Sequence, residues 1–202
     1  MKVLTMAEVA EWFASFKGWG DNYAHYDENG LYYSHPEANC IELQYPPLLE
    51  QLPFFAHYVA TIGYEDKHFD GALSFVADYG RWSPFNEGMG YRIVEHINAG
   101  HGQPISFEAG RAHRFRADEL VDAIGILMQP MIFAWRAFYL PSWSHGTGDF
   151  FLCVSHNSYV SVVTKTREFY DRVFKELIDH KYEPKIAPEN HKHWFCHPAR
   201  SA

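Results

Sequence analysis

The chain lacks the features that mark several large classes of protein. Its three cysteines are widely spaced and odd in number, which does not indicate a disulfide framework and fits a reduced compartment. No apolar run approaches the roughly 20 residues that cross a bilayer. The apolar pairs at the N-terminus are too short for a signal-peptide core. We therefore expect a cytoplasmic protein with no membrane partner.

Familiar catalytic motifs are also missing. The sequence contains no P-loop, dinucleotide fingerprint, HExxH or GxSxG pattern, so we expect no cofactor and disfavour the standard cofactor enzymes. Positive charge is scarce in residues 1–110, which carry a net charge of −10, whereas residues 111–202 carry +2. This balance disfavours broad nucleic-acid binding, which needs many Lys and Arg side chains, and is compatible with a basic protein partner.

What is present is a regular alternation of helix and strand patterns. Apolar spacing and capping residues predict helices over 5–17, from about 53 to 62, from 83 to 100, from 118 to a stop or kink before Pro130, and over 166–180. Strands are predicted over 39–45, 71–79, 104–109, 112–116 and 131–140, followed by a hairpin within 148–166.

This order predicts an α+β fold. We expect a mixed or mainly antiparallel sheet of about five to six strands with helices packed on it, ending in a β-hairpin and a C-terminal amphipathic helix. Residues 1–181 should form a single domain, and residues 182–202 an irregular C-terminal tail.

The hairpin places a histidine beside its bend. A two-residue Asn157-Ser158 turn would pair His156 with Tyr159, and a shifted turn would pair Ser155 with Ser158. In either register His156 lies at the tip or one residue from it, and no Ser-His-Asp pattern surrounds it. We predict a solvated turn histidine without a catalytic role.

The most distinctive polar cluster is the segment EAGRAHRFR. One hypothesis is an anion or phosphate pocket in which Arg111, Arg114 and Arg116 bind oxygens. His113 would then transfer protons, with His101 as a second acid or base. The alternative is a surface strand whose arginines pair with acids such as Asp118 and Glu119, and such pairs are common.

The C-terminal HKHWFCH offers four side chains that can bind a metal. These weak candidates are His191, His193, Cys196 and His197. Their spacing matches no standard zinc module, so we expect no physiological metal site.

Three functional hypotheses follow. The first is an acidic protein-interaction module, for example an immunity, inhibitor or regulatory protein of a bacterial conflict system. Its binding surface would include aromatic side chains of the N-terminal half, namely Trp19, Tyr23, Tyr26, Tyr32 and Tyr33. The second is a small hydrolase or phosphodiesterase using the central His/Arg cluster, which requires those side chains to converge in one pocket. The third is a structural subunit of a homo-oligomer.

Overall fold

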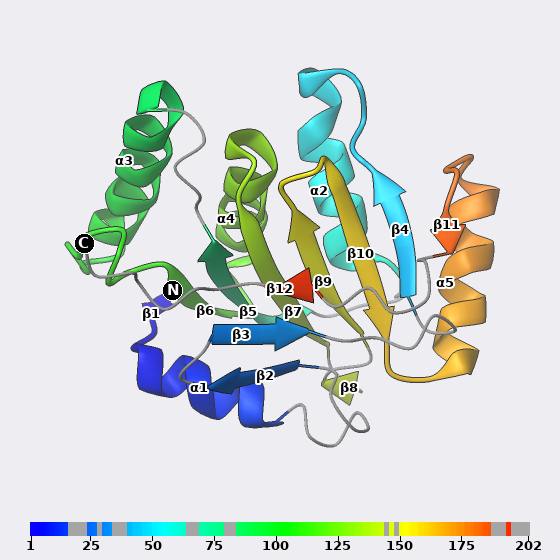
Figure 1. Ribbon diagram of the computed structural model, residues 1–202, viewed down its shortest axis with the longest axis horizontal. Coiled ribbons are helices and arrows are strands. Elements are labelled where there is room, and N and C mark those ends of the chain that lie inside the picture. Colours follow the sequence, from blue (N-terminus) through cyan, green and yellow to red (C-terminus); the bar gives the residue numbers. More distant parts are fainter. Residues whose placement is uncertain are drawn as a thin grey trace.

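The fold is seen in a computed structural model of the chain (Figure 1). The structure describes residues 1–15, 24–27, 30–33, 40–63, 69–78, 84–143, 146–147, 150–186 and 193–194. Within these ranges the α+β class is confirmed, since helices pack on a sheet in which every strand pairing is antiparallel. The described residues include no helix with the length and apolar character that crossing a bilayer requires.

The main sheet runs in the order β1-β6-β5-β7-β9-β10-β4-β11, with β8 paired to β7. Its strands are β1 (Lys2–Val3), β4 (Cys40–Gln44), β5 (Phe69–Asp78), β6 (Ala112–Arg116), β7 (Arg136–Trp143), β8 (Gly146–Thr147), β9 (Phe150–Ser155), β10 (Tyr159–Thr164) and β11 (Lys185–Ile186). The described part of this sheet has nine strands, more than the sequence predicts, because three of them are only two residues long.

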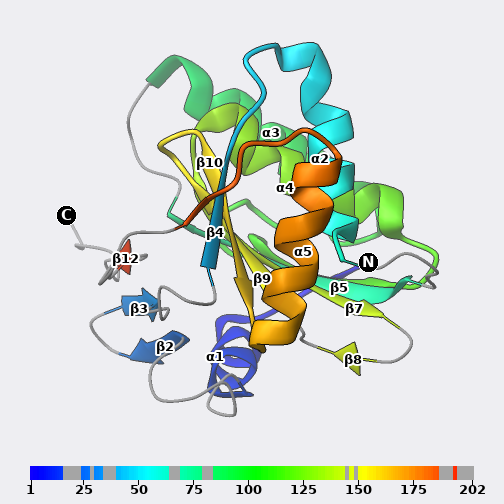
Figure 2. The ribbon, with the colours of Figure 1, turned by 90° about the vertical axis from the view of Figure 1, so that its right-hand side faces the viewer.

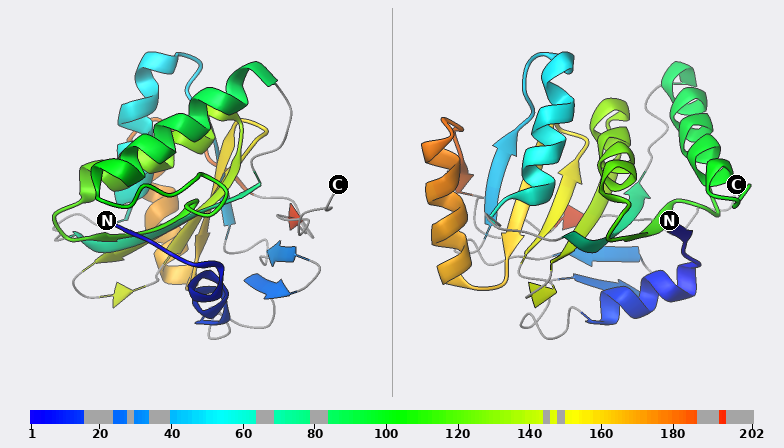
Figure 3. Two further views of the ribbon diagram at one scale, coloured as in Figure 1. Left: turned by 90° about the vertical axis from the view of Figure 1, so that its left-hand side faces the viewer. Right: turned by 180° about the vertical axis from the view of Figure 1, so that it is seen from behind.

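The helices are divided between the two faces of the sheet. They are α1 (Met6–Ser15), α2 (Leu52–Thr61), α3 (Pro84–Gly100), α4 (Leu120–Phe133) and α5 (Arg167–Asp179). Seen from behind, α2, α4 and α3 stand side by side against one face (Figure 3). On the other face α1 lies beside a small sheet of β2 (Ala24–Asp27), β3 (Gly30–Tyr33) and β12 (His193–Trp194) (Figure 2).

The strand directions fix where the helices begin and end. β4 and β5 run the same way, so α2 and α3, which follow them, both begin at one end of the molecule (Figure 1). The helices α4 and α5 run in the opposite direction and finish at that same end. The tip of the β9–β10 hairpin also lies there, so the β4–α2, β5–α3, α4–β7 and β9–β10 connections gather at one end of the strands.

Each face has its own apolar core, as the two-residue alternation of strands requires. The larger core includes Val59 of α2 and Leu152 of β9, and the smaller one includes Val9 of α1 and Phe151 of β9. Helix α1 begins with the predicted capping box. The backbone N–H of Thr5 donates to Glu8 Oε2 at 2.9 Å, and the N–H of Glu8 donates to Thr5 Oγ1 at 3.3 Å.

Three local predictions are wrong. The segment 104–109 is not a strand but a connection that turns near Gly110. Of the stop or kink predicted before Pro130, the stop is wrong, since the proline lies in the last turns of α4, which ends at Phe133. Ala134 caps it in a left-handed conformation with φ 54°. Residues 131–133 belong to this helix, and of the predicted strand 131–140 only 136–140 are in β7, which does lie centrally in the sheet.

The segment predicted as an irregular tail supplies two short strands. β11 pairs with β4 through Lys185–Glu42 and Ile186–Ile41, and β12 pairs with β3 through His193–Tyr33. Before these, Tyr182 stacks on Tyr58 of α2 with ring centroids 4.8 Å apart. The segment beyond α5 therefore packs against the fold at several places.

Candidate functional site

His113 lies inside the protein. It is on β6, on the face that the larger helical layer covers, and its exposed fraction is 0%. Its Nε2 atom lies 2.9 Å from Oδ1 of Asn98 on α3, which is also fully buried. Burial lowers the pKa of His113 from 6.5 to about 4, so the ring is neutral near pH 7. A substrate cannot reach this imidazole in this structure.

The arginines of the same segment point elsewhere. The Arg111 guanidinium lies 5.4 Å from the centre of the Phe75 ring, which belongs to the smaller core on the opposite face of the sheet. Arg114 is exposed. Arg116 is also exposed and forms ion pairs with Asp118 and Glu119. The pairing of a surface arginine with these two acids is therefore confirmed for Arg116.

His101 belongs to a different group of charges. Its Nε2 atom lies 3.3 Å from the carboxylate of Asp122, and its Nδ1 atom lies 3.5 Å from the backbone nitrogen of Met1. The Met1 ammonium in turn pairs with Glu119. Although burial alone would raise the pKa of Glu119, this ammonium and the nearby Arg116 groups hold that pKa below its usual value. These contacts attach the first strand to the α3–α4 side of the molecule.

The predicted anion pocket is therefore not assembled. His113 is enclosed, Arg111 lies on the other face, and Arg116 is engaged by acids at the surface. Convergence of these side chains in one pocket was the condition for the hydrolase hypothesis, and the structure does not bring them together.

The hairpin differs from both predicted registers. Tyr159 pairs with Ser155, so the loop has three residues, 156–158, and Ser158 takes the left-handed conformation with φ 65°. A type I turn followed by a left-handed residue is the usual form of a three-residue hairpin loop. His156 is half-buried, and its Nδ1 atom accepts a 2.6 Å hydrogen bond from Nε of Arg136 at the start of β7.

Several predicted positions cannot be placed by their side chains. Trp19 and Tyr23 lie outside the described residues, and Tyr26, Tyr32 and Tyr33 are described only by the backbone of β2 and β3. Of the metal candidates, His191, Cys196 and His197 lie outside the described residues, and His193 is seen only as a strand residue of β12. Among the described side chains, no group of three metal-ligating residues occurs.

A group of exposed apolar side chains lies where β4 leads into α2. Leu48, Leu49 and Phe54 are 51%, 71% and 80% exposed, and Glu50 lies among them in the sequence. We call these four residues the apolar corner. Pro46 and Pro47 end β4, and a short 3-10 helix, Leu49–Gln51, precedes α2. Because the inner side of α2 already packs on the core, Phe54 points away from it.

Sequence reasoning missed the apolar corner, although one clue was present. The apolar stripe of α2 runs through Phe55, Tyr58 and Val59, and Phe54 lies outside that stripe. Moreover, residues 46–61 contain a single Asp, Glu, Lys or Arg, which is Glu50. The outer surface of a helix normally carries several charged side chains. The nearly uncharged, exposed stretch 46–61 therefore differs from an ordinary helix surface.

The hairpin loop is attached to the chain just before the apolar corner. The backbone N–H of Tyr45 donates to the carbonyl of Ser158 at 2.9 Å, and the Tyr45 hydroxyl donates to the carbonyl of Ser155 at 3.0 Å. The exposed Asn157 and the Arg136–His156 pair belong to the same loop and its neighbouring strand. The polar groups of the loop are thus held against Tyr45, three residues before the apolar corner.

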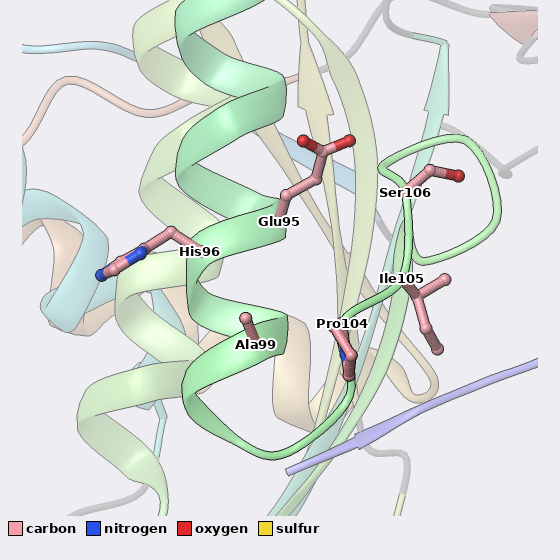
Figure 4. Close-up of a pocket in the computed structure, with 6 residues that line it drawn as sticks. All are labelled: Glu95, His96, Ala99, Pro104, Ile105 and Ser106. Carbon is pink, nitrogen blue, oxygen red and sulfur yellow. The ribbon is translucent and has the colours of Figure 1, made fainter.

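A second surface feature is a shallow pocket between α3 and the segment that follows it. It has a volume of about 410 Å³ and is lined by Glu95, His96, Ala99, Pro104, Ile105 and Ser106 (Figure 4). One carboxylate oxygen of Glu95 accepts a 2.9 Å hydrogen bond from the backbone N–H of Phe107, and His96 points away from residues 104–106. The Glu95 contact fixes the connection to α3, so this carboxylate has a structural role.

Comparison of the chain with models of protein families, with curated proteins and with solved structures finds no match.

Proposed function

We propose that this chain is a protein-interaction module that binds a basic protein partner through the apolar corner. The observation that carries the proposal is the exposure of Leu49 and Phe54, at 71% and 80%, on a stretch with one charged residue. Large exposed apolar side chains gathered in a short stretch, when they form one surface patch, mark interaction sites in monomeric proteins. Fully burying such a side chain has a transfer free energy of roughly 1.5–3 kcal/mol, from which the costs of association are subtracted.

The composition of the surroundings supports the choice of partner. Glu50 places a negative charge inside the apolar corner, and the chain as a whole carries −8, with −10 in its first 110 residues. Such a field accelerates encounter with a basic surface and repels an acidic one. Polar groups of the hairpin loop are bound to Tyr45, just before the corner in the chain, and could form the polar rim that surrounds the apolar centre of many interfaces. An immunity or inhibitor role is the specific form of this proposal.

The test compares the chain with two surface variants. Purified protein is used to capture partners from a host extract at low salt, alongside Phe54→Asp and Val121→Asp. Val121 is 82% exposed and lies at the start of α4, at the other end of the molecule, so it is a matched control. Each captured protein is then purified and its affinity measured by calorimetry.

Support requires a basic protein that binds in purified form with one-to-one stoichiometry. Its affinity should fall about 30-fold or more in Phe54→Asp, which corresponds to about 2 kcal/mol, and stay within twofold in Val121→Asp. Equal losses in both variants contradict the proposal. Light scattering of the chain alone is the second readout, since a dimer that Phe54→Asp dissociates would assign the apolar corner to self-association.

A further inference from the structure

The end of α3 is joined to β6 by a buried polar network. Asn98 Nδ2 donates to the carbonyl of Gly110 at 3.0 Å, which leaves its Oδ1 atom facing Nε2 of His113, 2.9 Å away. Because a carbonyl and an amide oxygen are acceptors, the proton of the neutral imidazole must reside on Nε2. The space around Gly110 is tight, since a Cβ there would lie 2.7 Å from Asn98 Nδ2. A glycine is therefore required next to this amide.

The surroundings of His113 resist a positive charge. Burial is the main cause of its lowered pKa, and both His101 and the N-terminal ammonium of β1 lower it further, against an opposing backbone contact with Gly110. The acids of this region are already engaged, since Glu119 pairs with the ammonium and Asp122 with His101. Opposite His113 in the sheet, Val3 of β1 and Ser74 of β5 offer no charge. Tyr139, which faces Ser74 from β7, is kept neutral because burial raises its pKa.

The side chains packed near this network, between α3 and the sheet, are aromatic. The ring of Phe107 stacks on Tyr91 of α3 with centroids 4.4 Å apart and lies 5.1 Å from the ring of Trp135. The N–H of Phe107 also donates to Glu95 on α3. Release of α3 from the sheet would separate Tyr91 from Phe107 and Trp135 and expose these rings.

We propose that protonation of His113 releases α3 and residues 104–110 from the sheet as a local unit. A charged imidazole in this enclosed position lacks the solvation that water gives it, and opening restores that solvation. We call the structure with α3 packed on the sheet the closed state and the released form the open state. The closed state is then favoured above the pH at which an exposed histidine titrates and is lost progressively as the pH falls. With a pKa of 6.5 in the open state and about 4 in the closed state, the opening equilibrium rises about 20-fold between pH 7 and pH 5.

Hydrogen exchange read by mass spectrometry measures this opening directly. Exchange is followed at pH 7 and pH 5 with labelling times matched for the intrinsic rate. The expected result is a loss of protection of about 20-fold in peptides covering 84–110, which at both pH values stay less protected than β7 and β9. The loss should vanish in His113→Gln, whose amide can still donate to Asn98, and persist in His96→Gln, an exposed position on α3. Persistence in His113→Gln, or protection equal to that of β7 and β9, overturns the proposal.

A second measurement does not depend on the variant folding. Nuclear magnetic resonance of the wild-type imidazole gives the protonation midpoint of His113 directly. A midpoint well below 6.5, with α3 amide protection falling progressively as the pH drops from 6.5 toward that midpoint, supports the proposal. A midpoint at or above 6.5 overturns it, because the closed state would then not disfavour the charge.

Discussion

The hydroxyl of Tyr45 donates a hydrogen bond to the backbone carbonyl of Ser155, 3.0 Å away. This contact joins the chain just before the apolar corner to the β9–β10 hairpin, and the Tyr45 ring packs edge-on against Phe55 of α2. Tyr45→Phe keeps the ring and removes only the hydroxyl. We expect the free energy of unfolding to fall by about 1 kcal/mol in urea denaturation, since a carbonyl loses its side-chain donor. A variant as stable as the wild type would mean that this contact does not hold the two segments together.

Tyr139, on β7, differs from Tyr45 in the hydrogen bonding of its hydroxyl. Its ring is fully buried, and its hydroxyl has no hydrogen-bond partner within the described ranges of the chain. A buried hydroxyl without a partner costs free energy, so Tyr139→Phe should raise the free energy of unfolding by about 1 kcal/mol. The measurement is the same denaturation experiment, run beside Tyr45→Phe. Destabilisation by Tyr139→Phe would show that this hydroxyl has an internal partner.

Two glycines on α3 test how closely that helix packs. A Cβ at Gly90 would lie 2.6 Å from the Trp135 ring, whereas one at Gly88, two residues earlier, would meet nothing within 4 Å. We expect Gly90→Ala to lower the free energy of unfolding by about 1–3 kcal/mol through overpacking. Gly88→Ala should raise it by about 1 kcal/mol, because alanine favours helix. Thermal melts of the two variants should therefore shift in opposite directions, and a shared direction would contradict the packing of α3 on Trp135.

The capping box of α1 should give a carboxylate-dependent stability. The Lys2 ammonium, followed by the Thr5 backbone N–H, lowers the pKa of Glu8 from 4.5 to about 2. Since the folded state binds the Glu8 proton more weakly than the unfolded state, the contribution of this carboxylate to the free energy of unfolding is complete above pH 4.5. It is lost as the pH falls through about 2. Glu8→Ala should lower the Tm by a few degrees at pH 7, with a difference that narrows toward pH 2. Glu11→Ala on the same helix is the control, and an equal effect there would argue against the capping box.

Much of the fold could be predicted because local patterns agreed with the tertiary structure. Thr5 and Glu8 form the capping box that their spacing predicts, and Phe55 and Val59 are buried as the stripe of α2 requires. The wrong predictions occurred where tertiary packing outweighs local preference. Pro130 removes only one hydrogen bond near the end of α4, and that loss is tolerated because Met131 packs into the core.

The candidate site was predicted less well, for a physical reason. The alternation of a strand shows which residues share a face but not which face is covered, and His113 proved to lie on the face beneath the helices. The three-residue hairpin loop was also missed, because its left-handed residue is Ser158, and serine is less typical of that conformation than glycine or asparagine. The exposure of Phe54, by contrast, could have been predicted from the sequence, because Phe54 lies outside the apolar stripe of its helix.

The most direct test of the central claim is site-specific photocrosslinking in the native host. A photoreactive amino acid replaces Leu49 in one variant and, in another, Val121, which is even more exposed and lies at the other end of the molecule. The account predicts a crosslink to one basic protein from position 49 that is absent from position 121 and is abolished when Phe54→Asp is added. Crosslinks from position 121 alone, or crosslinks from position 49 that Phe54→Asp leaves unchanged, would contradict it.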